Sequence, residues 1–263
     1  MGQPINDKHA IEVAAFIVAF ERPFSERSIE ALLGLQELLK ADYPAFNKIG
    51  VFKISFGDKT APSQPSNKIS GVLLQKFRTD GRPAWALRVE NNNIIVSCFD
   101  YERWEPSSSK AIEHLKKVIN IIYVYDEQNP LGIVALQVID RFVSHDDGYD
   151  IGHVFNRKTR YLTKQAIEAG SLWHVHQGWF REEKTVDVKY SCLNTLNVSA
   201  SSGPVGLIST IDHTLECRFK QGLSVCEALD EDFLRDIFGL LHGYNKDVVG
   251  DLLNSRQKKR IGL

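Results

Sequence analysis

Apolar positions along the chain follow two patterns, one typical of strands and the other of helices. Residues 11–20 are apolar at nearly every position, which is typical of a strand that is covered on both faces or central in its sheet. Residues 26–41 then carry apolar side chains at helical spacing, with Ser25 as a candidate N-cap. We therefore expect a strand followed by a helix that packs against it.

A stretch rich in Pro, Ser and Lys at residues 57–71 predicts a long loop. Strand patterns return after it, at residues 72–77, 84–90 and 94–99, with short connections typical of hairpins. Ser107 begins a second amphipathic segment that reaches Ile122. A further apolar strand is expected over residues 131–143.

The acidic, glycine-containing segment 144–150 is the best place to divide the chain. We expect halves at residues 1–145 and 146–263, packed as one compact unit. The second half shows a short helix at 162–169 and strands at 172–180, 186–200 and 205–219. It ends in a wide apolar stripe over about residues 230–254, which predicts a long C-terminal helix.

Strand patterns outnumber helical ones, and most connections are too short for parallel crossovers. The predicted fold class is therefore α+β, with a mainly antiparallel sheet, helices packed on one face and a long C-terminal helix.

Composition narrows the function classes. The 263 residues include 32 Lys and Arg against 33 Asp and Glu, a formal charge of -1. Such a chain has no global positive field, so nucleic acid is disfavoured as a partner. No apolar run approaches the roughly 20 residues that span a bilayer, and the N-terminus does not resemble a signal peptide. Four scattered cysteines fit a reducing compartment, so we expect a cytoplasmic protein.

The sequence carries none of the familiar catalytic or cofactor motifs. It lacks a phosphate-binding glycine loop, a nucleophile elbow, a zinc-protease helix motif and a CxxC pair. We therefore assign no catalytic residue and no cofactor, and lean against an enzyme.

One segment has the spacing of metal ligands. His174 and His176 would project to the same face of a strand, and Asp212 on a later strand could complete a zinc or iron site. The alternative is that this histidine pair is polar surface. The neighbouring Trp179, Phe180 and Arg181 are candidates for a partner-binding surface, because Trp and Arg are enriched at binding hot spots.

Three further residue groups are weaker candidates, and each is explained more simply by a structural role than by a functional site. Asp146, Asp147 and Asp150 lack the spacing of a calcium loop and suit a solvated loop. Nothing in the sequence places Cys192, His174 and Asn194 together as a Cys–His–Asn catalytic set. The segment Gln257-Lys258-Lys259-Arg260 carries three basic side chains, which could bind phosphate but also complement a helix C-terminus.

Three segments together resemble a sporadically distributed family of uncharacterised bacterial proteins of about this length. They are residues 11–20 with Asp42-Tyr43-Pro44, residues 85–88 with 99–105, and residues 240–253 with the C-terminal Arg260-Ile261-Gly262-Leu263. The chain departs from the family in residues 132–140, where the family carries an arginine-rich pattern. The resemblance implies no catalytic residue, and the family's patchy distribution resembles that of genes on defence islands.

The leading hypothesis is a non-enzymatic recognition or adaptor protein that acts through a protein partner encoded nearby. It would serve as a subunit of an anti-phage defence system, and a homodimer is kept open as an assembly. The first alternative is a module that binds a hydrophobic small molecule or lipid under the C-terminal helix. The second is a metal-dependent hydrolase that uses His174, His176 and Asp212.

Overall fold

Strands from both ends of the chain join in one sheet. The computed structural model describes residues 2–6, 8–51, 68–144, 149–184, 189–204, 206–230 and 232–263. Nine strands follow the order β3-β4-β5-β6-β2-β7-β10-β9-β8, and β1 adds to β7. The strands are β1 (Gln3–Pro4), β2 (Ile11–Phe20), β3 (Ala45–Val51), β4 (Lys68–Phe77), β5 (Pro83–Glu90), β6 (Asn93–Cys98), β7 (Leu131–Ser144), β8 (Trp173–Lys184), β9 (Lys189–Gly203) and β10 (Gly206–Leu223). Every pairing between these strands is antiparallel.

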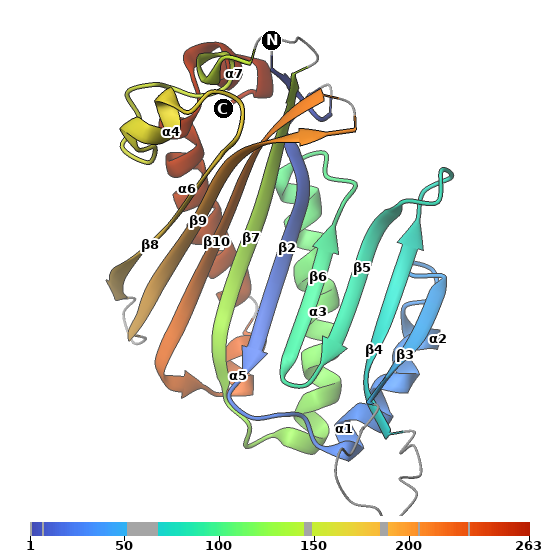
Figure 1. Ribbon diagram of the computed structural model, residues 1–263. Coiled ribbons are helices and arrows are strands. Elements are labelled where there is room, and N and C mark those ends of the chain that lie inside the picture. Colours follow the sequence, from blue (N-terminus) through green and yellow to red (C-terminus); the bar gives the residue numbers. More distant parts are fainter. Residues whose placement is uncertain are drawn as a thin grey trace, which may run out of the picture.

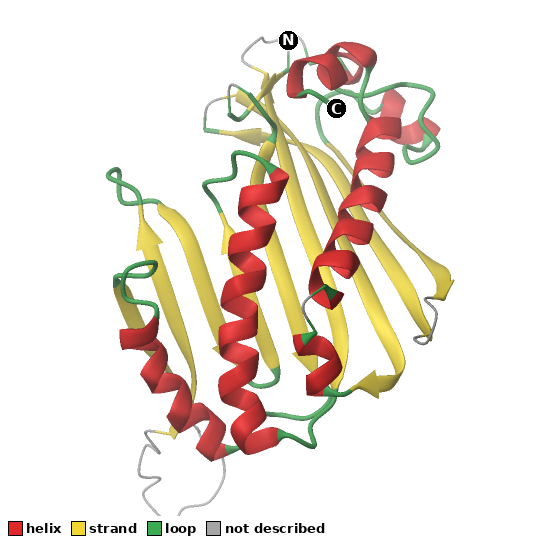
Figure 2. Ribbon diagram, turned by 180° about the vertical axis from the view of Figure 1, so that it is seen from behind, coloured by secondary structure: helices red, strands yellow, loops and turns green. Residues whose placement is uncertain are grey.

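The helices are α1 (Glu26–Ala31), α2 (Leu35–Leu38), α3 (Trp104–Asp126), α4 (Lys164–Glu168), α5 (Val225–Leu229), α6 (Phe233–Leu252) and α7 (Ser255–Ile261), with short 3-10 turns at Leu32–Gly34 and Ile151–His153. The two long helices, α3 and α6, lie against the same face of the sheet (Figures 1 and 2). Both chain termini lie at the end of the molecule that carries α7 (Figure 1).

The two halves of the chain repeat one element order. Each begins with a long apolar strand, continues through a short helix and an antiparallel meander, and ends in a long helix. The two first strands, β2 and β7, pair at the centre, and each is flanked by the last strand of its own half, β6 or β10. The sheet is therefore arranged about the β2–β7 pair, with one more strand, β3, on the side of the first half.

The register of the central pair matches residues between the halves. Phe20 at the end of β2 lies opposite Leu131, the first residue of β7, and Asp140 lies opposite Ile11, the first residue of β2. A register shift follows each of these outer pairs, so the strand pair is symmetric in its bulges as well. Phe20 and Asp140 therefore occupy equivalent positions in the two halves.

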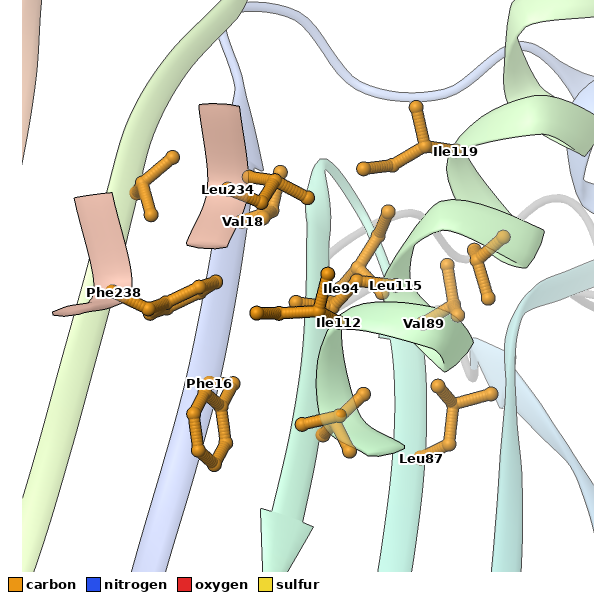
Figure 3. Packing of buried hydrophobic residues seen from close by; sticks show 14 of the residues in the cluster. Phe16, Val18, Leu87, Val89, Ile94, Ile112, Leu115, Ile119, Leu234 and Phe238 are labelled. Atoms are coloured by element: carbon orange, nitrogen blue, oxygen red, sulfur yellow. The ribbon is translucent and has the colours of Figure 1, made fainter. Parts of the chain in front are cut away.

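The core lies between the sheet and the long helices. The larger cluster contains Phe16 from the first half and Phe238 from the second, whose rings meet edge-on with centroids 5.2 Å apart. Figure 3 shows Phe16 and Phe238 beside residues of α3 and β6. A second cluster around Phe142, Phe155 and Leu252 lies toward the end that carries α7. The apolar stripe of α6 spans both clusters, which is why that helix is long.

The α+β class, the mainly antiparallel sheet and a long helix near the C-terminus are confirmed. The predicted loop at 57–71 is too long at one end, because residues 68–71 belong to β4, and residues 57–67 lie outside the described residues. Strand β3 has no counterpart in the prediction. No helix among the described residues is long and apolar enough to cross a membrane.

Candidate functional site

A belt of polar side chains crosses the interior between the two hydrophobic clusters. Asp140, Asn194, His213 and Asn245 are all buried, and they come from β7, β9, β10 and α6. Each lies on the inward face of its element, between an apolar residue of one cluster and an apolar residue of the other. Buried polar groups cost free energy unless they are hydrogen-bonded. The hydrogen-bond partners of this belt therefore have to be identified.

The sequence holds a signal for this belt. Along β7 the inward positions are alternate residues, and Val138 and Phe142 on either side of Asp140 are buried and apolar. A charged residue in phase with an inward apolar pattern breaks the strand's period of two. His213 breaks the pattern in the same way between Ile211 and Leu215 on β10. Asp140 is absent from the predicted site residues, because the pattern of residues 131–143 as a whole predicts only an apolar strand.

A pocket of about 990 Å³ opens onto one end of this belt. Its lining combines segments that are distant in sequence: the N-terminal segment with the start of β2, the start of α3, Asp140, the second half of α6, and the C-terminal residues. These residues include Lys8, His9, Ile11, Tyr101, Glu102, Arg103, Trp104, Glu105, Asp140, His242, Asn245, Lys246 and Leu263. The volume is at the upper end of the range for small-molecule sites.

Asp140 is the most unusual group of the pocket. Its side chain is 3% exposed, and no described residue gives its carboxyl a hydrogen bond or an ion pair. Burial raises the pKa of Asp140 from 3.8 to about 7, because water no longer stabilises the charged form. The negative field of Asp140 also contributes, after burial, to raising the pKa of the neighbouring Tyr101 to about 12.

Aromatic rings form the walls beside this carboxyl. Trp104, at the start of α3, stacks in parallel on His242 of α6 with ring centroids 3.9 Å apart. His9 meets Tyr101 edge-on at 5.3 Å. Burial lowers the pKa of His9 and lowers that of His242 to about 4, so both rings are neutral at physiological pH. Nδ1 of His9 is buried and has no hydrogen-bond partner among the described residues.

The other polar side chains of the belt have hydrogen-bond partners for some of their atoms. Nδ1 of His213 lies 3.0 Å from Oδ1 of Asn245, which fixes the ring and makes Nδ1 the donor. Burial lowers the pKa of His213 to about 4, and within the described part of the chain its Nε2 has no hydrogen-bond partner. Asn245 also lines the pocket, so it connects the pocket to His213 behind it.

The residues predicted as metal ligands lie elsewhere. His174 and His176 are exposed on β8, with ring centroids 6.5 Å apart, on the sheet face opposite the long helices. Asn197 of β9 lies in register between His176 and Asp212, and it hydrogen-bonds to His176. Two strand spacings therefore separate His176 from Asp212, about 10 Å. The structure brings the two histidines together and leaves Asp212 apart, hydrogen-bonded by Gln137. Within the described part of the chain, no three His, Cys, Asp or Glu side chains form a metal-binding group.

The residues predicted to bind a partner divide between two faces of β8. Trp179 stacks on Tyr161, and Arg181 lies over the ring of Tyr244 on α6 with its guanidinium 4.5 Å from the centroid. Phe180 points to the other face and is 61% exposed. The three side chains therefore do not form one patch.

The remaining candidates from the sequence are also placed apart. Cys192 and Asn194 face the helices on β9, whereas His174 is on the opposite face. Asp150 forms an ion pair with Arg157 at 2.6 Å, and Asp146 and Asp147 lie outside the described residues. The basic residues Lys258, Lys259 and Arg260 belong to the last turn of α7, where they complement the helix C-terminus.

Comparisons with known proteins add no functional assignment. No protein-family model and no curated protein matches the sequence. One solved structure, the di-domain ARO/CYC protein StfQ of steffimycin biosynthesis, matches with 11% identity over 95% of this chain and 99% of that one, at a TM-score of 0.19. DynU16, a protein of the dynemicin biosynthetic locus, matches with 9% identity over 77% of this chain and 86% of that one, at 0.22. At such TM-scores neither similarity carries an argument.

Proposed function

We propose that the protein is a recognition protein that binds a small molecule in the pocket beside Asp140. The observation that carries the proposal is a carboxyl group that is buried, lines a pocket and has no partner among the described residues. Burying such a group without compensation is costly, so its partner is expected to be a ligand that donates hydrogen bonds.

The internal repeat supports this interpretation. At the position equivalent to Asp140, the first half has Phe20, which is buried and packs edge-on against Phe24 at 5.2 Å. The architecture therefore accepts an apolar side chain at this place in the sheet. An acid that the fold does not require, placed at a pocket, supports a role in binding.

The location of the ligand differs from the cavity envisaged under the C-terminal helix. The first half of α6 inserts Leu234, Phe238 and Leu241, which are fully buried, into the space above the sheet. The residues of α6 that border the pocket run from His242 to Val249, beyond these three apolar side chains. We therefore propose that the ligand binds at the end of the helix layer, against polar as well as apolar groups.

The other roles predicted from the sequence remain proposals, and no contact among the described residues supports them. These are an adaptor with a nearby-encoded protein partner, membership of an anti-phage defence system, a cytoplasmic location and homodimer formation. The hydrolase with His174, His176 and Asp212 would need Asp212 to approach the histidines across β9.

Fragment binding tests the proposed pocket. We expect single-ring fragments with N–H donors, such as benzamidine and 2-aminopyridine, to bind wild-type protein in saturation-transfer NMR. Binding should weaken at least about tenfold in Asp140→Phe, which copies the first half, and in Asp140→Asn, because the charged acceptor is lost. Asp212→Asn is the matched control, since its carboxyl lies on the other face of the sheet. Equal binding by wild-type protein and both Asp140 variants would refute the proposal.

A further inference from the structure

Three cations surround the mouth of the pocket. Lys8, Arg103 and Lys246 are exposed and come from the N-terminal segment, the N-cap of α3 and the second half of α6. None of the three forms an ion pair with another described residue. Arg103 contributes to lowering the pKa of His9, and Lys246 to lowering that of His242, so both cations act on the interior of the pocket.

The start of α3 adds to this positive character. Arg103 at the N-cap makes no side-chain capping hydrogen bond, and the first turn, at Trp104 and Glu105, lines the pocket. The α3 helix has 23 residues, and the N–H groups of its first two residues, before Pro106, can act on an anion together with the helix dipole. Glu102 and Glu105 also lie at the mouth and offset part of this charge. The cations come from three separate elements, which suits an anionic group with several oxygens.

The interior of the pocket favours a hydrogen-bond donor, whereas the mouth favours an anion. Asp140 offers a carboxylate with no partner among the described residues, in a site that is also lined by Tyr101 and the stacked pair Trp104 and His242. Planar rings pack favourably against aromatic side chains, and a carboxylate pairs best with two adjacent N–H donors. The interior therefore suits a flat heterocycle that carries such donors on one edge.

These two ends together define a ligand class. We infer that the pocket binds a nucleotide, with a guanine base on Asp140 and the phosphate group at Lys8, Arg103, Lys246 and the start of α3. Guanine presents an N–H and an adjacent amino group, which match the two oxygens of one carboxylate. Aromatic stacking and reading of the base edge by hydrogen bonds are the usual means by which proteins hold an isolated base. This inference rests on the proposed function, since it uses the same pocket.

Calorimetric titration of the full chain with defined nucleotides tests the inference. We expect GMP to bind at least about tenfold more tightly than IMP, which lacks the amino group, and at least tenfold more tightly than guanosine, which lacks the phosphate. Inorganic phosphate alone should bind much more weakly than GMP. Asp140→Asn should remove the preference for GMP over IMP. Lys246→Ala should weaken GMP binding more than it weakens guanosine binding, and Asp212→Asn should behave as wild type.

The outcomes separate this inference from the proposed function. The donor fragments could bind through Asp140 while GMP binds no better than IMP, guanosine or phosphate. That result would refute the nucleotide inference and leave the proposed small-molecule pocket intact. If neither the fragments nor GMP depend on Asp140, both are wrong. A GMP affinity that falls equally in Asp140→Asn and Asp212→Asn would also refute the inference, because the two carboxyls lie on opposite faces of the sheet.

Discussion

Asp140→Leu is expected to be more stable than the wild-type protein at pH 8, by up to about 4 kcal/mol in the free energy of unfolding. Burial raises the pKa of Asp140 from 3.8 to about 7, so the folded protein holds this proton more tightly than the unfolded chain does. Each pKa unit corresponds to about 1.4 kcal/mol, and the difference between the two values gives the expected size. Leucine removes the need to ionise a group inside the protein.

The pH dependence of this difference has a defined sign. The folded state binds more protons at Asp140 than the unfolded state between about pH 4 and 7, so the wild-type protein loses stability as the pH rises through that window. The advantage of the leucine variant should therefore be roughly two- to threefold smaller at pH 5 than at pH 8. Urea denaturation of both proteins at the two pH values measures it. Contributions from His213 and His242 are common to both proteins and cancel in the difference.

Asp212→Asn serves as the control for this experiment, since its carboxyl is on the open face and hydrogen-bonded by Gln137. Its stability should change by less than about 1 kcal/mol at either pH. A leucine variant that is no more stable than wild type at pH 8 would show that Asp140 has a stabilising partner inside the protein. The argument for a ligand at Asp140 would then fail.

Phe238→Ala is expected to lower the free energy of unfolding by about 3–5 kcal/mol. Phe238 is fully buried on α6 and meets Phe16 of β2 edge-on, so its ring joins the last helix to the first half of the chain. Figure 3 shows the two rings side by side in the cluster. Removing the ring leaves a cavity that the surrounding strands and helices cannot close, and chemical denaturation measures the loss.

Leu240→Ala is the matched control on the same helix. Leu240 is only partly buried, so its truncation should cost clearly less than that of Phe238. The comparison also tests where a ligand can lie. If the space under the first half of α6 were an unfilled ligand cavity, Phe238→Ala would be tolerated with a loss below about 1 kcal/mol.

The predicted and observed structures agree best where one segment carries its own pattern. The long apolar strand at residues 11–20 is β2, bounded as expected, and the stripe of the last long helix is α6. Agreement is poorer where pairing alone defines the element. Strand β3 is short and carries a weak pattern, and it is a strand because β4 pairs with it. The start of β4 lies in a polar stretch that reads as a loop until its partner is known.

The candidate site shows the same division. The sequence places His174 and His176 on one face of a strand, and the structure agrees, because a period of two is local geometry. It could not tell that Asn197 separates His176 from Asp212, since register depends on the turns and on the burial of other strands. The same alternation divides Trp179 and Arg181 from Phe180.

The amino-acid sequence by itself determined the class of this protein: an α+β chain with an antiparallel sheet, apolar central strands and a long helix near its end. Hydrophobic periodicity is a property of each segment, so it can be read without knowing the neighbours. Only the tertiary structure decided that the chain is a repeat about β2 and β7, and that Asp140 lies where its counterpart is Phe20. The tertiary structure also determines the position of the pocket. Its lining comes from both termini, α3, β7 and α6, and only the packing of the helices on the sheet brings these segments together.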